Sequence, residues 1–304
     1  MVLRMRALLG IVGAAMFSSC ATTSLPFAPS PPAAAASIPA EPVREPAGYR
    51  EVRALGARIG LPDAELFCPQ QYEAPADGVV PLYLHFQGGA KAAAENFSRM
   101  HCPGVLIAST LSGRSGAFAA PYRDRAAFAA LLAAGEHELT THWGRPIHFG
   151  SIVITFWSAG YGAVRELLKD EEWRARIVGL VSADSIYASV VAASVRAPNL
   201  DDIDGFVRFA QAAARGDKVL VLAFGQYQTE YASTKETATL LCASVAAQLQ
   251  PSCTHTERGL RIANEAHVGG FHCYEFGEAT AGIHVDLLYF VPEMVRRHLH
   301  RASR

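Results

Sequence analysis

Short apolar runs alternate with longer amphipathic stretches along most of this chain, and this alternation constrains its fold more than any other feature. Five runs rich in β-branched and aromatic residues are predicted to be buried strands: 79–89, 104–110, 149–157, 178–184 and 218–225. Helical patterns lie between or after them, at residues 124–139, 162–177, 200–216 and 234–249. Such alternation predicts an α/β fold, with a mostly parallel sheet that helices cover on both faces.

The end of the chain is expected to complete this sheet. A sixth strand is predicted in either residues 259–266 or residues 270–276, and a closing helix follows over 283–300. Because proline removes a helical hydrogen bond, that helix is expected to break or restart near Pro292. There is no internal repeat, so residues 48–304 are predicted to form one domain.

Charge and hydropathy argue against nucleic-acid binding and against a membrane-spanning helix in the body of the chain. The formal net charge is −1 and no basic block is present, so the electrostatic pattern of a nucleic-acid-binding protein is missing. The body of the chain has no run of 18 apolar residues, so a transmembrane helix is not expected there.

The N-terminus predicts export. In residues 1–19, Arg4 and Arg6 precede a short apolar run, and two small residues precede Cys20. The segment resembles a bacterial lipoprotein signal, which implies that Cys20 is lipidated and anchors the protein in a membrane. By the same resemblance, Ala21 implies an outer-membrane location in the bacterial cell envelope, facing the periplasm. The alternative is an ordinary signal peptide cleaved nearby.

Two further predictions concern the residues after Cys20 and the remaining cysteines. Residues 20–47 are rich in proline and alanine and cannot bury enough apolar surface to fold, so they are predicted to be a tether. Disulfides are permitted in an oxidising compartment, and plausible pairs are Cys68 with Cys102, and Cys242 with either Cys253 or Cys273. Setting Cys20 aside leaves five cysteines, so at least one thiol stays free. No spacing of cysteine and histidine residues indicates a zinc site.

One serine stands where a predicted strand meets a predicted helix. In ITFWSAGYGAVRELL, residues 154–168, the β-branched run stops at Trp157 and Ser158 follows, with Gly160 and Gly162 behind it. Ligands bind at the carboxyl ends of parallel strands, and a sharp turn there pushes a serine hydroxyl out of the sheet. The alternative is an ordinary turn of small residues in which Ser158 has no catalytic role.

This stretch resembles the nucleophile elbow of the α/β-hydrolase family, G-x-S-x-G. The resemblance implies that Ser158 is a nucleophile and that the Ala159 N–H faces an oxyanion. Phe156 stands where the family has its first glycine, and a bulky residue there is expected to crowd the turn. The segment LHFQGGA, residues 84–90, is then the counterpart of the family's oxyanion loop, with donors near Gln87 and Gly88.

A serine nucleophile needs an imidazole base. The resemblance favours His284, which lies between the last predicted strand and the last helix, as a loop residue leading into that helix. His267 and His272 are close in sequence, and either is an alternative base or a residue of the pocket wall.

The carboxylate that orients the base has two candidates. Asp184 directly follows an apolar strand and is favoured. Its alternative role is structural, as the N-cap of a helix. Glu230 follows the next strand, where most members of the family carry the acid. The favoured order of Ser158, Asp184 and His284 matches the family's order of nucleophile, acid and histidine.

The leading hypothesis is an exported, lipid-anchored serine hydrolase that cleaves a carboxylic ester or amide of a small molecule or an envelope acyl substrate, without metal or cofactor. The alternative is a binding or scaffolding lipoprotein that keeps the fold and has lost catalysis. A weaker version has the hydrolase act on envelope carbohydrate or peptide. Arg114, in a Gly- and Ser-containing loop, either meets an anionic group of the substrate or is simply solvated.

Overall fold

The computed structural model describes residues 52–299 except 193 and 195, and the described residues form one ten-stranded sheet. The predicted signal at 1–19, Cys20 and the tether at 20–47 lie outside the described residues. The strands follow the order β1-β2-β4-β3-β5-β6-β7-β10-β9-β8 across the sheet. Their bounds are β1 Gly56–Leu61, β2 Ala64–Pro69, β3 Val79–Phe86, β4 Val105–Ser109, β5 His148–Trp157, β6 Ile177–Ala183, β7 Val219–Phe224, β8 Gln250–Pro251, β9 Ile262–Val268 and β10 Phe271–Phe276.

The centre of the sheet is parallel and its two edges are antiparallel. Strands β4, β3, β5, β6, β7 and β10 pair in parallel. On one side β2 pairs antiparallel with β4 and β1 with β2, and on the other side β9 pairs antiparallel with β10 and β8 with β9. The prediction of a mostly parallel α/β sheet is therefore confirmed. Both proposed positions of the sixth strand are strands, because β9 and β10 form a hairpin.

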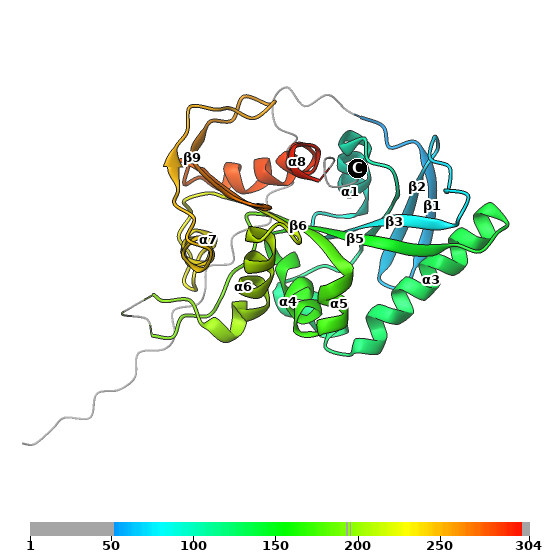
Figure 1. Cartoon of the computed structure of the whole chain (residues 1–304), viewed down its shortest axis with the longest axis horizontal. Helices are drawn as coiled ribbons and strands as arrows, with labels where there is room; N and C mark the ends of the chain where they lie inside the picture. The colour runs from blue at the N-terminus through cyan, green and yellow to red at the C-terminus, as the bar shows by residue number, and fades with distance from the viewer. Residues whose placement is uncertain (1–51, 193, 195, 300–304) are drawn as a thin grey trace, which may run out of the picture. The chain divides into compact units, whose positions relative to one another are not determined.

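Helices cover both faces of the sheet. α1 and α8 lie on one face, and α3 to α6 lie on the other (Figure 1). The helices are α1 Ala90–Met100, α2 Ser115–Tyr122, α3 Arg125–Trp143, α4 Tyr161–Lys169, α5 Glu171–Arg176, α6 Leu200–Ala214, α7 Thr234–Ser244 and α8 Ala281–His298. Each face has its own buried hydrophobic cluster.

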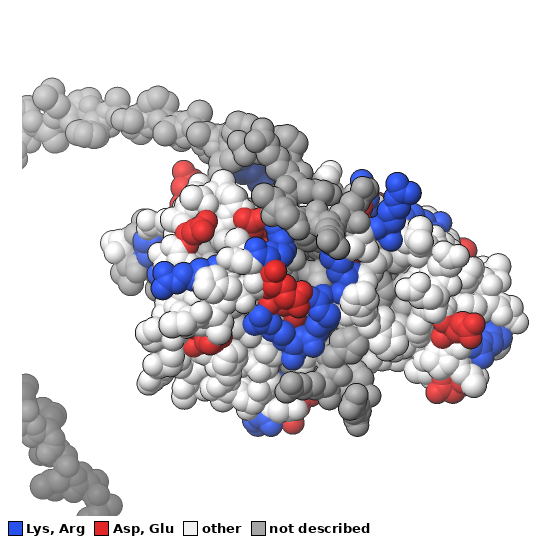
Figure 2. Space-filling view, turned by 90° about the horizontal axis from the view of Figure 1, so that it is seen from above, with Lys and Arg blue, Asp and Glu red and all other residues white. Residues whose placement is uncertain are grey.

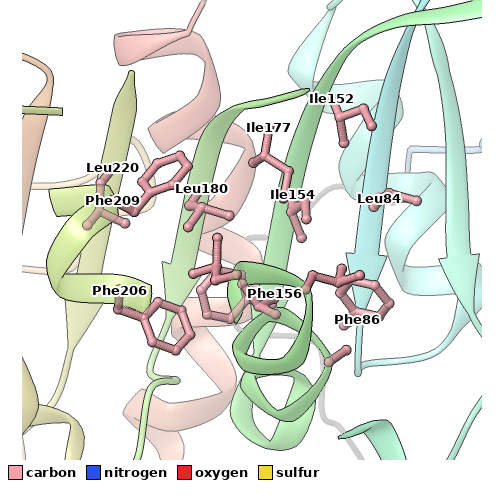
Figure 3. Close-up of a cluster of buried hydrophobic side chains, with 14 of the residues drawn as sticks. Leu84, Phe86, Ile152, Ile154, Phe156, Ile177, Leu180, Phe206, Phe209 and Leu220 are labelled. Carbon is pink, nitrogen blue, oxygen red and sulfur yellow. The ribbon is translucent and has the colours of Figure 1, made fainter. Parts of the chain in front are cut away.

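The central strands are mostly apolar because both of their faces are buried. Side chains alternate along a strand, so Ile154 and Phe156 enter the cluster under α3 to α7, whereas Val153 and Trp157 enter the cluster under α1 and α8. Figure 3 shows the first cluster, where the side chains of β3, β5 and β6 meet those of α6. This continuous burial explains why the strands are easy to recognise in the sequence.

Local capping residues correct one predicted helix and support another. The stretch 162–177 is two helices, because the Asp170 side chain accepts the N–H groups of Glu172 and Trp173 and starts α5 after α4 has ended. The predicted helix at 234–249 begins as α7 with a complete capping box between Ser233 and Glu236.

The predicted break at Pro292 is wrong. α8 runs without interruption from Ala281 to His298, with Pro292 inside it. A proline cannot donate to the carbonyl four residues earlier, here that of Leu288. The buried Asn96 side chain from α1 donates to that carbonyl at 3.0 Å instead. The helix therefore tolerates the proline because a neighbouring helix supplies the lost donor.

The cysteines separate into one possible pair and three others. All five described cysteines are free thiols. Cys68 and Cys102 belong to clusters on opposite faces of the sheet, so this predicted pair is wrong. The thiols of Cys242 in α7 and Cys273 in β10 are neighbours in the same buried cluster, and each shifts the pKa of the other, whereas Cys253 is exposed.

We expect Cys242 and Cys273 to form a disulfide when the protein is purified from an oxidising compartment. The bond would close a loop between α7 and β10 and stabilise the fold by about 2–4 kcal/mol. Non-reducing peptide mapping should recover the linked peptides, and dithiothreitol should lower the melting temperature. Cys253→Ser should keep that reductant-sensitive shift, and Cys242→Ser should abolish it. Alkylation of both Cys242 and Cys273 in the protein purified without reductant would contradict the expectation.

The surface shows no segregation of charge on the face seen in Figure 2. Blue and red side chains lie interspersed there, as the near-zero net charge leads one to expect. Within the part of the chain that the structure describes, none of the helices has the length and apolar character needed to cross a bilayer.

Candidate active site

Three neighbouring strands end at the same edge of the sheet, and each is followed by a residue with left-handed backbone. Gln87 follows β3, Ser158 follows β5 and Asp184 follows β6, with φ angles of 72°, 49° and 41°. A left-handed conformation costs a non-glycine residue on the order of 1–3 kcal/mol, and such residues cluster at functional sites. The edge where parallel strands end is also where α/β proteins bind ligands.

The turn at Ser158 is tight because two glycines let the backbone of neighbouring segments approach. Ser158 opens a short 3₁₀ turn, Ser158–Gly160, that leads directly into α4. A Cβ on Gly160 would lie 2.3 Å from the backbone oxygen of Phe86, and one on Gly162 would lie 2.1 Å from that of Ser115. The turn is thus packed against the end of β3 on one side and against the start of α2 on the other.

The side chain of Phe156 does not crowd this turn, so that expectation is wrong. Phe156 is fully buried and its ring lies 6.2 Å from that of Phe206 in α6. Figure 3 shows the side chain pointing into the core between the sheet and its helices. The pleat of β5 directs this position to the core, so a large apolar residue is accommodated there.

His284 and Asp184 form a direct hydrogen bond. The Nδ1 of His284 lies 2.6 Å from Oδ2 of Asp184. The other carboxylate oxygen of Asp184 accepts the Thr234 hydroxyl at 2.6 Å and the Gly225 N–H at 3.4 Å. Asp184 is buried, whereas a quarter of the His284 side chain is exposed. Because the carboxylate is held at both oxygens, it fixes the orientation of the imidazole.

Trp157 ties His284 to the serine turn. Its indole N–H donates to the backbone carbonyl of His284 at 2.7 Å, and the two rings lie 4.8 Å apart. The sequence predicts His284 in a loop before the last helix, but the residue lies in the first turn of α8. Since Trp157 directly precedes Ser158, this contact brings the first turn of α8 beside the end of β5.

A second contact fixes the other side of the serine turn. The hydroxyl of Ser185 donates to the backbone carbonyl of Ser158 at 2.6 Å. Ser185 directly follows Asp184, so the segment just after β6 supplies both the partner of His284 and the residue that holds Ser158. The three segments that bear Ser158, Asp184 and His284 are therefore linked pairwise.

The alternative acid and the alternative bases lie elsewhere. Glu230 is exposed in the loop between β7 and α7 and, among the described residues, forms no hydrogen bond or ion pair with His284. His267 and His272 lie on β9 and β10, hydrogen-bonded to each other, and His272 stacks on His298 at the end of α8. Burial, followed by the charge of His267, lowers the pKa of His272 to about 4. Neither histidine is brought to Asp184.

The loop after β3 keeps the glycine-rich shape expected of an oxyanion loop. Gln87, Gly88 and Gly89 all have positive φ, at 72°, 109° and 84°. A side chain on Gly88 would meet Leu288 of α8 at 3.2 Å. The backbone of this loop therefore passes close to the helix that carries His284.

Sequence reasoning missed the residue beneath this loop, His85. It is buried, its Nδ1 lies 2.7 Å from the hydroxyl of Thr155, and that hydroxyl donates to the carbonyl of Leu84. Burial lowers the pKa of His85 to about 4, so the imidazole is neutral at physiological pH. The one available signal was a histidine inside an otherwise apolar strand. Thr234 and Ser185 carried no signal beyond ordinary capping and loop residues.

Comparison with known proteins adds no assignment. Among the described residues, no group of three or more His, Cys, Asp or Glu side chains is placed to hold a metal ion. No protein-family model matches this sequence, and no curated protein matches it at significant similarity.

Proposed function

We propose that this protein is a serine hydrolase of the α/β-hydrolase type, which cleaves a carboxylic ester or amide through an acyl-enzyme. The observation that carries the proposal is the hydrogen bond between His284 and Asp184 at the edge of the sheet where Ser158 turns. A buried carboxylate that orients an imidazole beside a strained serine is the arrangement that serine nucleophiles require.

Each residue has a distinct part in the reaction. Asp184 accepts the Nδ1–H of His284, which leaves Nε2 unprotonated as the base. His284 takes the proton of the Ser158 hydroxyl as its oxygen attacks the carbonyl carbon, and returns that proton to the leaving alcohol or amine. Water, deprotonated by the same imidazole, then attacks the acyl-enzyme, and the second tetrahedral intermediate collapses to release the acid and regenerate Ser158.

Backbone N–H groups stabilise the tetrahedral intermediates in this mechanism. The Ala159 N–H and the N–H groups of Gln87 and Gly88 are the donors for the developing oxyanion. The positive φ angles of the loop after β3 support this role, because they turn its backbone out of the regular strand. One such donor typically contributes about 3 kcal/mol to transition-state stability. The mechanism requires no cofactor.

The proposed setting is the bacterial cell envelope, with Cys20 as the lipid anchor and residues 20–47 as the tether. This part of the proposal rests on the sequence alone. It places the hydrolase beside envelope acyl compounds and leaves nucleic acid out as a partner.

A fluorophosphonate probe tests the proposal directly. The folded protein should become labelled at Ser158, and peptide mapping should locate the adduct there. Ser158→Ala should abolish labelling, whereas Ser151→Ala, an exposed serine near the other end of β5, should keep it. Absence of labelling in folded protein would favour the alternative, an inactive binding or scaffolding lipoprotein whose role survives Ser158→Ala.

A further inference from the structure

Three tyrosine rings form a row that starts at the serine turn. Tyr161 follows the 3₁₀ turn of Ser158, and its ring lies 5.6 Å from that of Tyr187. The ring of Tyr187 lies 5.3 Å from that of Tyr231, again in an edge-to-face arrangement. The Tyr187 hydroxyl donates to the backbone carbonyl of Asp184 at 3.2 Å. The row therefore connects the residues of the candidate triad to the loop before α7.

The outer end of this row is held in place although its ring is exposed. Half of Tyr231 is accessible to solvent. Its carbonyl accepts hydrogen bonds from Arg196 at 3.0 Å and from Thr229 at 2.6 Å, and the next residue pairs with Ala188 in a β-bridge. An exposed aromatic ring on a fixed backbone loses little entropy when it binds a ligand.

Arg114 lies beside this row. The hydroxyl of Tyr161 lies 3.2 Å from that of Ser115, which directly follows Arg114. Arg114 is exposed and forms no ion pair with any carboxylate of residues 52–299 that the structure describes. Its positive charge acts on Tyr231, where it opposes the rise that burial causes in the pKa of that hydroxyl. The contact between Tyr161 and Ser115 places Arg114 next to the inner end of the row.

We propose that Arg114 and the row of Tyr161, Tyr187 and Tyr231 select the substrate, which is an ester carrying an aromatic ring and a carboxylate. The rings pack against the aromatic part, and the guanidinium binds the carboxylate in a charge-assisted pair. This inference rests on the proposed function and names the substrate class for the same site. It also gives Arg114 the ligand-binding role that the sequence left open.

Matched pairs of esters test the charge preference. One pair is 4-acetoxybenzoate and its methyl ester, with the charge on the leaving side. The other is the mono-4-nitrophenyl ester of terephthalic acid and the corresponding methyl ester, with the charge on the acyl side. Each kcat/KM is divided by the rate of that ester with hydroxide, which removes differences in intrinsic reactivity.

In at least one pair, the carboxylate form should be preferred by about tenfold or more, as hydrogen bonds to charged groups allow. Arg114→Gln should remove that preference by lowering kcat/KM for the carboxylate ester more than for the neutral ester. Arg123→Gln, which makes the same change in net charge just beyond the other end of α2, should retain it. Tyr231→Ala should lower kcat/KM for the aromatic esters more than for vinyl acetate. Tyr231→Phe, which keeps the ring, should lower kcat/KM for the aromatic esters less than Tyr231→Ala does.

The failures are distinguishable. If Ser158 is labelled by the fluorophosphonate but neither pair shows a charge preference, this inference is wrong and the proposed function stands. A preference that survives Arg114→Gln also overturns the inference. A folded protein that neither labels nor hydrolyses any of the esters overturns the proposed function, and the inference with it.

Discussion

Asp184→Asn should lower kcat for ester hydrolysis by a factor on the order of 10⁴, because an amide in place of the carboxylate favours the wrong tautomer of the histidine. The amide would still accept the Thr234 hydroxyl, so the fold should be retained. Only the proton on Nδ1 of His284 loses its anionic acceptor. Initial rates on a 4-nitrophenyl ester measure the effect, with circular dichroism to verify folding.

Glu230→Gln is the matched control for this change. The substitution is again carboxylate to amide, and it lies in the loop after β7, the strand that follows β6 in the sheet. Because Glu230 is exposed and, among the described residues, forms no hydrogen bond or ion pair with His284, kcat should stay within about a factor of two of the original value. A large loss in Glu230→Gln together with a small loss in Asp184→Asn would assign the acid to Glu230.

Gly160→Ala should damage both stability and reactivity. Its Cβ would lie 2.3 Å from the backbone oxygen of Phe86, which no side-chain rotation relieves. Overpacking of this kind costs about 1–3 kcal/mol, and we expect the upper end because the contact is with backbone. The strand ends must move apart, and a displacement near 1 Å at a reacting group lowers rates by roughly 10²-fold. Urea unfolding and the rate of fluorophosphonate labelling measure the two effects.

Gly60→Ala is the control for added volume. Gly60 is exposed on β1, and nothing lies within 4 Å of the position its Cβ would take. The free energy of unfolding of this variant should lie within about 0.5 kcal/mol of that of the original protein, and Ser158 should be labelled at the same rate. If Gly160→Ala behaved in the same way, the close packing of the serine turn on β3 would have no part in the site.

The central sheet was predictable because its signal is local. Strands that are buried on both faces have nearly continuous apolar sequences, and β3 to β7 were recognised on that basis. The antiparallel edge formed by β1 and β2 was missed, because β1 has exposed and half-buried residues in alternation and no strong apolar run. The break before α5 was missed because it depends on one capping side chain, that of Asp170.

The residues of the candidate site could be singled out from the sequence, but their geometry could not. The position after a buried strand singled out Ser158 and Asp184, and the chain order singled out His284. The support around them comes from residues distant in sequence: Trp157 binds the carbonyl of His284, and Thr234 binds the carboxylate of Asp184. No local pattern encodes contacts across 127 or 50 residues.

The left-handed backbone at Ser158 has a consequence for the evolutionary history of this chain. Glycine would adopt a φ of 49° without penalty, so Ser158→Gly would relieve strain in any descendant that only needed to bind. Natural selection for stability alone would therefore favour loss of the hydroxyl. Serine at such a position is what selection for turnover would leave behind, with thermostability given up in exchange for reactivity.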